Sequence, residues 1–266
     1  MHLFPIVNIM GIDFDLSAII AILVSVTITF VIARLAVRNL SVDNPSKMQN
    51  FMEWVVEFIH STIASSMPVQ KAKAYISLGM TLIMFIFISN LLGLPFMVVT
   101  DATQPYPWIG VTEQYLADHG GTAHIAWWKS PTADLGVTAG LAIVVFVLVH
   151  YLGIKLNRKH YFQHYLHPYP VFFPVNVIET LAKPLTLALR LYANILAGEI
   201  LISTILKLSY IGIPFMMAWQ GFSIFVGAIQ AFLFTVLTMV YISQATIHDD
   251  HEEVEPVKAG VEHAKA

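Results

Sequence analysis

Five apolar stretches, each long enough to cross a lipid bilayer as a helix, constrain the fold of this chain more than any other feature. A transmembrane helix needs roughly 20 apolar residues to cross about 30 Å of hydrocarbon. The stretches are Leu16–Val37 and residues 75–99, 132–156, 172–208 and 214–247. They predict an all-α membrane protein with five transmembrane helices. Ser130-Pro131 is expected to cap the third helix, and the second is expected to end near Gly93 and Pro95.

The last two stretches are too long to stand upright in a bilayer. At 1.5 Å per residue, the 37 residues of 172–208 and the 34 residues of 214–247 would form helices of roughly 55 Å and 50 Å. Such helices must tilt well beyond the common ~20°. Gly212 and Pro214 are expected to form the turn between them, so the C-terminal third is predicted to be a hairpin of two strongly tilted helices.

The composition agrees with a membrane protein. Apolar residues make up 57% of the chain and charged residues 12%, about half of the ~25% typical of a soluble domain. This excludes a water-soluble enzyme. The absence of cysteine excludes disulfides, thiolate metal sites and a cysteine nucleophile. A net charge of -3 and the lack of any dense basic stretch argue against a nucleic-acid partner.

Residues 46–66 form a different kind of segment, an amphipathic helix. Its apolar residues recur at helical spacing, while Glu53, Glu57 and His60 take the other side. The apolar stripe consists of Phe51, Trp54, Val55, Phe58, Ile59 and Ile63. This pattern predicts an interfacial helix lying in the membrane surface. A helix packed on a partner is the alternative.

The distribution of Lys and Arg orients the chain. With five crossings, one side carries Arg34, Arg38, Lys47, Lys71, Lys73, Lys155, Arg158 and Lys159. The other side carries only Lys129 and Lys207 outside the membrane. By the positive-inside rule the N-terminus is outside and the C-terminus cytoplasmic. We therefore expect one domain, 1–266, with an outer segment 1–15, membrane helices in 16–247 and a polar cytoplasmic tail, 248–266.

The fourth apolar stretch holds ionisable residues that are costly inside a membrane and are therefore functional candidates. Arg190 lies near its middle and cannot shed its proton, so it must face water or a carboxylate. At 100° per residue, Arg190 shares one stripe with Glu179, Lys183, Thr186 and Asn194. Glu199 falls on the opposite face. Glu179 and Lys183 could also be only a structural i,i+4 ion pair.

Folding the hairpin about residue 211 predicts which polar residues meet across it. Arg190 then lies level with Gln230 near mid-membrane, and Glu199 lies level with Ser223 nearer the outside. Asn176, Glu179, Lys183 and Thr186 lie nearer the cytoplasm, as candidates for a cytoplasmic half-channel. The result is a polar path in two halves with a fixed positive charge between them.

A fixed cation would obstruct a continuous cation pore but suits a relay to a moving carboxylate. A protonated carboxylate that arrives from lipid ionises beside Arg190, because a nearby cation lowers the pKa of an acid. It must take up a proton from the other half-path before it leaves. No carboxylate of this chain is placed for that role, so a partner must supply it.

These residues carry a resemblance to a known family. ETLAKPLTLALRLYANILAGEI (179–200) and FSIFVGAIQAFLFTVLTMVYIS (222–243) resemble the two signature stretches of subunit a of the F-type ATP synthase. NFMEW, SNLLGLPF and WWKSPTAD support the resemblance, which covers nearly the whole chain and is closest to the Gram-positive bacterial form. It implies a plasma-membrane stator subunit that is not catalytic by itself.

The resemblance also implies roles for residues and partners. Arg190 would be the essential stator arginine, with Asn194 and Gln230 beside it, and Glu199 and Ser223 would belong to an outer half-channel. Some family members have His where this chain has Ser223, and serine cannot titrate near neutrality. The implied partners are a rotor ring of c subunits, a b-subunit stalk, the remaining ATP synthase subunits and the lipid bilayer. H⁺ would be the ion, with Na⁺ left open.

Several weaker signals have two interpretations. Asn90 is either a helix-to-helix hydrogen-bond partner or a channel residue, and Gly136 and Gly140 predict close helix packing. The acidic, aromatic segment 100–131 is expected to be a solvated loop, although its outer-mouth candidates could line the channel. These candidates are Asp101, Asp118, His119, His124 and Asp134.

Histidines give the remaining weak signals. His160, His164 and His167 fit an interfacial belt better than a metal site, and His248 and His251 fit at most adventitious binding. We expect no metal and no cofactor.

Two other classes of function fit a chain with buried charges. A proton-coupled secondary transporter commonly shows internal repeats, and none is visible. An intramembrane hydrolase needs a nucleophile and a base within reach, and neither the G-x-S-x-G nor the H-E-x-x-H motif occurs.

Overall fold

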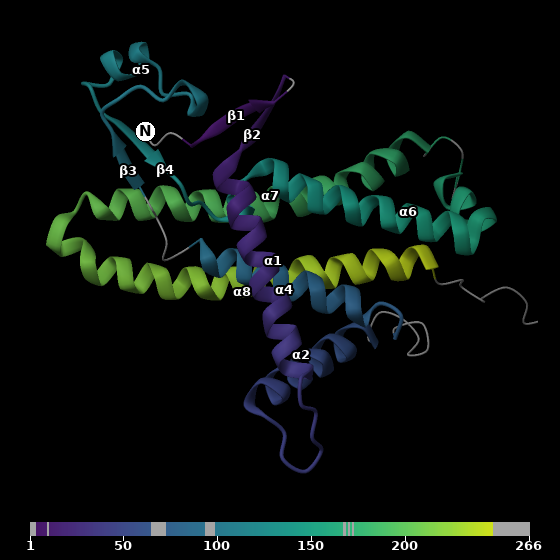
Figure 1. Ribbon diagram of the computed structural model, residues 1–266. Helices are drawn as coiled ribbons and strands as arrows, with labels where there is room; N and C mark the ends of the chain where they lie inside the picture. The colour runs from purple at the N-terminus through teal and green to yellow at the C-terminus, as the bar shows by residue number, and fades with distance from the viewer. Residues whose placement is uncertain are drawn as a thin grey trace, which may run out of the picture.

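The computed structural model describes residues 4–9, 11–64, 73–93, 99–166, 169, 171 and 173–246. Lys71, Pro95, His167, the tail 248–266 and the side chains of His160, His164 and Glu199 lie outside the described parts. The elements, in chain order, are β1 (Ile6–Ile9), β2 (Ile12–Asp15), α1 (Leu16–Val37), α2 (Lys47–Ala64), α4 (Ile76–Leu92), β3 (Val99–Ala102), η1 (Pro107–Ile109), α5 (Glu113–Asp118), β4 (Ala123–Ala126), η2 (Pro131–Ala133), α6 (Leu135–Leu166), α7 (Phe173–Leu206), η4 (Ser209–Ile211) and α8 (Gly212–Thr246). The mostly helical fold confirms the predicted class (Figure 1).

Among the described residues, four helices are long and apolar enough to cross a membrane. The spans are Leu16–Val37, Leu135–Leu156 within α6, Phe173–Ile202 within α7, and the whole of α8. The first has the predicted bounds. α4 is apolar but only 17 residues long, which is short against the roughly 20 that a full crossing needs. The count of five crossings therefore stays a prediction.

α4 ends at Leu92 with Gly93 as its C-cap, so the expected end near Gly93 is confirmed, although the helix does not continue to residue 99. The predicted bounds of the third span are wrong. α4 ends at Leu92 because two of its C-terminal carbonyls are capped from the 128–130 segment: Trp128 Nε1 donates to Leu92 O at 2.9 Å, and Ser130 Oγ to Ser89 O at 3.0 Å. α6 begins after Asp134, whose carboxylate accepts the backbone N–H groups of Gly136 and Val137. Ser130-Pro131 opens the 3₁₀ turn η2 instead. α6 then continues to Leu166, beyond its apolar stretch.

The last two helices form the predicted hairpin. α7 has 34 residues and α8 has 35, and they run side by side across the direction of α1 (Figure 1). The turn is not at Gly212 and Pro214, which both lie in the first turn of α8. It is formed by residues 207–211, including η4. A Cβ on Gly212 would approach the Ile205 carbonyl oxygen to 2.5 Å, so this tight turn requires glycine there.

The core lies where α4, α6, α7 and α8 meet. Its fully buried side chains include Ile86 of α4, Leu191 of α7, and Phe234, Met239 and Ile242 of α8. The buried residues of α8 recur three, four or seven apart and so share one face. A Cβ on Gly140 would meet no described atom within 4 Å, and a Cβ on Gly136 would meet only the Asp134 carboxylate. The close helix packing predicted for that pair is therefore wrong.

The segment predicted to be a solvated loop is folded. β3 and β4 pair antiparallel, from Val99 with Ala126 to Ala102 with Ala123. With η1 and α5 they enclose a separate apolar cluster that includes Ile109, Val111, Leu116 and Ile125. We call residues 99–126 the β3–β4 lobe. Ahead of α1, β1 and β2 form a second hairpin, which the sequence did not indicate.

α2 divides the apolar stripe that was predicted to lie in the membrane surface. Val55, Ile59 and Ile63 are buried against the helical core. Phe51, Trp54 and Phe58 stay exposed, with the Trp54 and Phe58 rings stacked at 5.9 Å. The prediction that the stripe lies in the membrane surface is therefore wrong for Val55, Ile59 and Ile63. The exposed aromatic half remains available to a membrane surface.

Candidate ion path

The polar stripe of α7 stands on the surface of the helical hairpin. Arg190 and Asn194, one helical turn apart, are both exposed. Asn194 Nδ2 donates to Gln230 Oε1 of α8 at 3.1 Å, and Gln230 itself is only 3% exposed. The structure thus brings Asn194 and Gln230 together, with Arg190 one turn further along α7. Within the described part of the chain, Arg190 has no ion-pair or hydrogen-bond partner for its guanidinium.

The candidates predicted nearer the cytoplasm follow the stripe toward the start of α7. Lys183 Nζ lies 3.2 Å from Glu179 Oε1 and 5.7 Å from the centroid of the Tyr241 ring of α8. The hydroxyl of Thr186 donates to the carbonyls of Ala182 and Lys183 in its own helix. Asn176 is half-buried, one turn before Thr180. The Glu179–Lys183 pair has the i,i+4 geometry of a structural ion pair.

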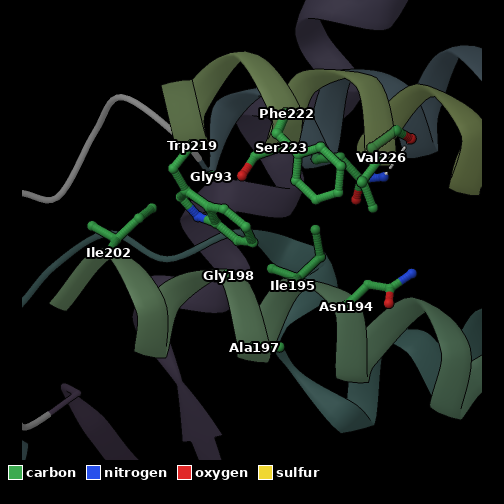
Figure 2. Close-up of a pocket in the computed structure, with 12 residues that line it drawn as sticks. Gly93, Asn194, Ile195, Ala197, Gly198, Ile202, Trp219, Phe222, Ser223 and Val226 are labelled. Carbon is green, nitrogen blue, oxygen red and sulfur yellow. Dashed lines mark hydrogen bonds between the residues drawn. The ribbon is translucent and has the colours of Figure 1, made fainter. Parts of the chain in front are cut away.

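A cavity of about 240 Å³ lies between α7 and α8, close to the end of α4 (Figure 2). Its polar wall comes from Asn90, Asn194, Trp219 and Ser223. Glycines 93, 198 and 227 and apolar side chains form the rest of the wall. Ser223 therefore lies on the space between α7 and α8. The Ser223 Oγ and Trp219 Nε1 atoms are buried and lack hydrogen-bond partners among the described residues.

Glu199 directly follows Gly198, which lines the cavity from α7. The backbone of Glu199 belongs to α7, and the Glu199 side chain lies outside the described parts. The predicted meeting of Glu199 with Ser223 is therefore untested. Trp219 is a cavity residue that the sequence analysis missed. Its spacing four residues before Ser223 on α8 could have found it, because residues four apart share a helix face.

Asn90 is a helix-to-helix hydrogen-bond partner, the first of its two interpretations, and its role as a channel residue stays a prediction. Its Nδ2 donates to Gly227 O at 3.0 Å, and its Oδ1 accepts from Thr132 Oγ1 at 2.7 Å. The residue is 3% exposed and joins α4 to α8 and to η2. It also lines the cavity. Both ends of its amide are thus satisfied by protein, which fixes its orientation at the cavity wall.

The outer-mouth candidates do not line this cavity in the described structure. Asp101 pairs with His124 across the β3–β4 lobe, with Oδ1 and Nδ1 2.6 Å apart. His119 Nδ1 lies 3.0 Å from Tyr115 O, within α5 and its C-cap. Asp134 instead binds Lys129, whose Nζ lies 2.7 Å from Asp134 Oδ2 and 2.5 Å from Asp15 Oδ2.

The pKa values of Lys129 and Asp134 shift in opposite directions because the two groups are paired. Burial lowers the pKa of Lys129, but hydrogen bonds to Asp134 and Asp15 outweigh burial and raise it. Burial raises the pKa of Asp134, but Lys129 and the N–H groups of Gly136 and Val137 outweigh burial and lower it. The Lys129–Asp134 pair is thus held in its ionised form near neutral pH.

Across the described residues, no group of three or more His, Asp or Glu side chains could hold a metal ion. The histidines once considered for a metal site, His167, His248 and His251, lie outside those residues, as do the side chains of His160 and His164. The described polar groups at the hairpin are the Arg190 guanidinium, the Glu179–Lys183 ion pair, amides, hydroxyls and an indole N–H.

This set of groups can hold water and anions but offers few ligands to a bare cation. Asn and Ser side chains donate and accept, whereas the Trp N–H and the guanidinium only donate. An exposed guanidinium on a membrane-spanning helix is complementary to a carboxylate. The arrangement suits proton exchange with a partner that carries an acid.

Comparison with known proteins agrees with this geometry. A family model described as ATP synthase A chain matches residues 17–243. The ATP synthase subunit a of Anoxybacillus flavithermus is 46% identical over 257 residues, covering 93% of this chain and 99% of that protein. The ATP synthase subunit a of Bacillus subtilis is 42% identical over 265 residues, with coverage of 93% and 99%. That of Staphylococcus carnosus is 42% identical over 263 residues, with coverage of 94% and 99%.

Proposed function

The chain belongs to the ATP synthase A chain family, and from this membership we propose that it is the ion-translocating stator subunit of an F-type ATP synthase. In this role it has no catalytic centre of its own. It forms two offset aqueous half-channels that load and unload carboxylates on a rotor ring of c subunits. Arg190 separates the half-channels, so protons cross only with the moving carboxylates. The coupling ion is H⁺, because protons can move through hydroxyls and water without a cage of oxygen ligands.

The exposed Arg190 carries this proposal. A permanent charge on a membrane-spanning helix requires a counter-charge, and none contacts it among the described residues. A carboxylate on a partner would supply one. A rotor carboxylate passing Arg190 would ionise there and become protonated again on leaving, since a nearby cation lowers its pKa. The Asn194–Gln230 hydrogen bond, one turn away, fixes the α7–α8 register beside it.

The two half-channels are assigned by position. Ser223, Glu199 and the cavity form the outer half-channel, and Asn176, Glu179, Lys183 and Thr186 line the cytoplasmic one. This orientation follows from the excess of Lys and Arg on the side of α2, which puts the N-terminus outside and the C-terminus in the cytoplasm. Reporter fusions at both ends test it, and two ends on the same side would refute it.

The partners follow from the same role. The slanted hairpin of α7 and α8 faces the curved rotor ring, and its exposed apolar residues include Leu185 and Leu189 of α7. A b-subunit stalk stands beside the N-terminal helices, and the remaining ATP synthase subunits complete the complex in the bacterial plasma membrane. A density map of the whole complex with α7 and α8 upright would contradict the slanted arrangement.

Substitution of Arg190 in the whole complex tests the mechanism. Arg190→Ala should abolish ATP synthesis and raise passive proton leak, because no fixed charge then separates the half-channels. Arg190→Lys should also fail, with less leak, because it keeps a charge but loses the planar guanidinium and can deprotonate. The amount of the subunit in the complex is measured first. Near-normal ATP-driven proton pumping by an assembled Arg190→Ala complex would overturn the mechanism.

A further inference from the structure

Two polar atoms beside the cavity have no hydrogen-bond partner among the described residues. The Trp219 Nε1 and Ser223 Oγ atoms are both buried, and neither has a hydrogen bond to any described residue. A buried polar group without a partner costs about 1–3 kcal/mol, and the indole N–H of a buried Trp usually finds one. Two such atoms on one cavity wall therefore need an explanation.

The two side chains point into the same space. Trp219 and Ser223 are four residues apart on α8 and so share one face. In Figure 2 the indole of Trp219 reaches from α8 toward Gly198 of α7, and the Ser223 oxygen faces the same gap. Gly198 has no Cβ to fill that gap. The indole is held in place by contact with Phe222, at a ring-centroid distance of 5.3 Å.

The cavity is large enough for the missing partner. Its volume is about 240 Å³, and a single water needs roughly 10–15 Å³ of such volume together with two or more polar contacts. The indole N–H can only donate, whereas the serine hydroxyl can donate and accept. Water in the cavity can therefore accept from Trp219 Nε1 and can bond to Ser223 Oγ in either direction.

We propose that Trp219 is a water-binding residue of the outer half-channel, whose indole N–H anchors a water shared with Ser223. This inference rests on the proposed function, in which the cavity is part of a proton path. Because the anchor only donates, the bound water turns its oxygen toward Trp219 and its hydrogens toward Ser223 and the rest of the cavity. Trp219 thereby orients the first link of the path without itself carrying a proton.

Trp219→Phe in the complete ATP synthase, reconstituted in vesicles, tests the inference. The substitution keeps an aromatic ring against Phe222 and removes only the N–H and part of the ring. Proton-driven ATP synthesis should fall roughly two- to tenfold, the effect of losing one hydrogen bond, while the amount of assembled complex stays unchanged. The matched control is Trp54→Phe, because Trp54 is an exposed tryptophan on α2. It should leave synthesis unchanged.

A vibrational spectrum of the indole provides a second readout that does not depend on flux. The difference between the parent and Trp219→Phe complexes isolates the Trp219 signal, which should be that of a hydrogen-bonded N–H. A free N–H would overturn the inference, as would unchanged synthesis in Trp219→Phe. Glu199→Gln and Ser223→Ala separate the two proposals. If these two variants also leave synthesis unchanged, the outer half-channel itself is misplaced. If Glu199→Gln and Ser223→Ala reduce synthesis and Trp219→Phe does not, only the role proposed for Trp219 is wrong.

Discussion

Ser223 gives the cavity wall a hydroxyl that bonds to water in either direction and has no charge change near neutral pH. An outer path built on Ser223 alone would therefore conduct with little pH dependence of its own. Any ionisation in that region would belong to Glu199, which follows the cavity residue Gly198 on α7. The chemistry of one side chain thus decides whether the outer path has one titrating group or two.

Ser223→His should therefore add a pH dependence without blocking the path. The cavity of about 240 Å³ has room for an imidazole, and the ordinary pKa of His is about 6.5. A neutral imidazole can relay protons, whereas an imidazolium below that pH repels them. ATP synthesis should be near the parent value at an outer pH of about 8 and fall below a pH of about 6.5. Ser223→Asn, which is polar and does not titrate, is the control. Identical pH profiles for the two variants would contradict the expectation.

The Asn194–Gln230 contact and the Glu179–Lys183 pair were predictable from spacing, but the register across the hairpin was not. The sequence placed Arg190 level with Gln230, whereas Asn194, one turn later, makes the bond. A count from the turn ignores the shape of the 207–211 connection, which lies before Gly212 rather than at it. Trp219 shares the Ser223 face of α8, but an aromatic residue in an apolar helix is ordinary, so its spacing alone did not single it out. Only the cavity shows that its N–H lacks a partner.

At the scale of elements, the contact between α4 and α8 fixes the wall of the cavity. Gly227 lets the two helices approach, since a Cβ there would lie 3.1 Å from Asn90 Cβ. Asn90 cannot move aside easily, because its amide is held at both ends by Gly227 O and Thr132 Oγ1. The close approach therefore depends on the missing side chain.

Gly227→Ala should destabilise the subunit despite the better helix propensity of alanine. Overpacking typically costs about 1–3 kcal/mol, against a gain of about 1 kcal/mol for replacing glycine in a helix. Gly221→Ala is the matched control on the same helix, because a Cβ at Gly221 would meet nothing within 4 Å. It should be neutral or slightly stabilising. Thermal denaturation of the assembled complex measures both, and equal midpoints would remove Gly227 from this role.

Helix existence followed from hydropathy, but helix ends followed from contacts that hydropathy does not contain. α4 stops where Trp128 and Ser130, far along the chain, bind its last carbonyls. α6 continues past its apolar part because helical hydrogen bonds persist in polar sequence, where nothing before Pro168 breaks them. The apolar length of a helix is set by lipid, whereas its full length is set by capping.

At the scale of the whole molecule, α1 separates two regions. The β1–β2 hairpin and the β3–β4 lobe lie at the N-terminal end of α1, and α2 lies at its other end (Figure 1). The two small sheets were not predictable, since their four-residue strands are too short for an alternating pattern to stand out. Turns at Gly110, Gly120 and Gly121, all with positive φ, shape the lobe.

Lys129 ties these parts to the helical core. Asp15, bound by Lys129, caps α1 by accepting the N–H groups of Ser17 and Ala18. Asp134, also bound by Lys129, caps α6. One ammonium thus joins two helix starts that lie far apart in sequence. Its side chain is 10% exposed, and those of Asp15 and Asp134 are 18% and 27% exposed.

The pH range over which this link holds follows from its pKa shifts. The pKa of Asp134 is lowered, so its contribution is present above the ordinary aspartate pKa of about 3.9. That contribution is lost as the pH falls through the lowered value. The pKa of Lys129 is raised, so its contribution is present below about 10.4 and is lost as the pH rises through the raised value. Over the whole physiological range the link should stay closed.

Lys129→Met should therefore loosen the segment that connects the β3–β4 lobe to α6. Removing one partner of a buried ion pair costs roughly 3–5 kcal/mol, and a loss near 3 kcal/mol would raise local opening about 100-fold. Since the chain has no cysteine, Ser130→Cys provides a single label site, and Ser130 is fully buried. A membrane-impermeant maleimide added outside should label this cysteine slowly with Lys129 present and far faster in Lys129→Met.

Lys129→Arg should restore most of the protection, because Arg also bonds two carboxylates. Lys207→Met, at an exposed position after α7, controls for loss of a positive charge. Equal labelling rates in Lys129→Met and Lys207→Met would show that the ammonium does not hold the lobe to the core.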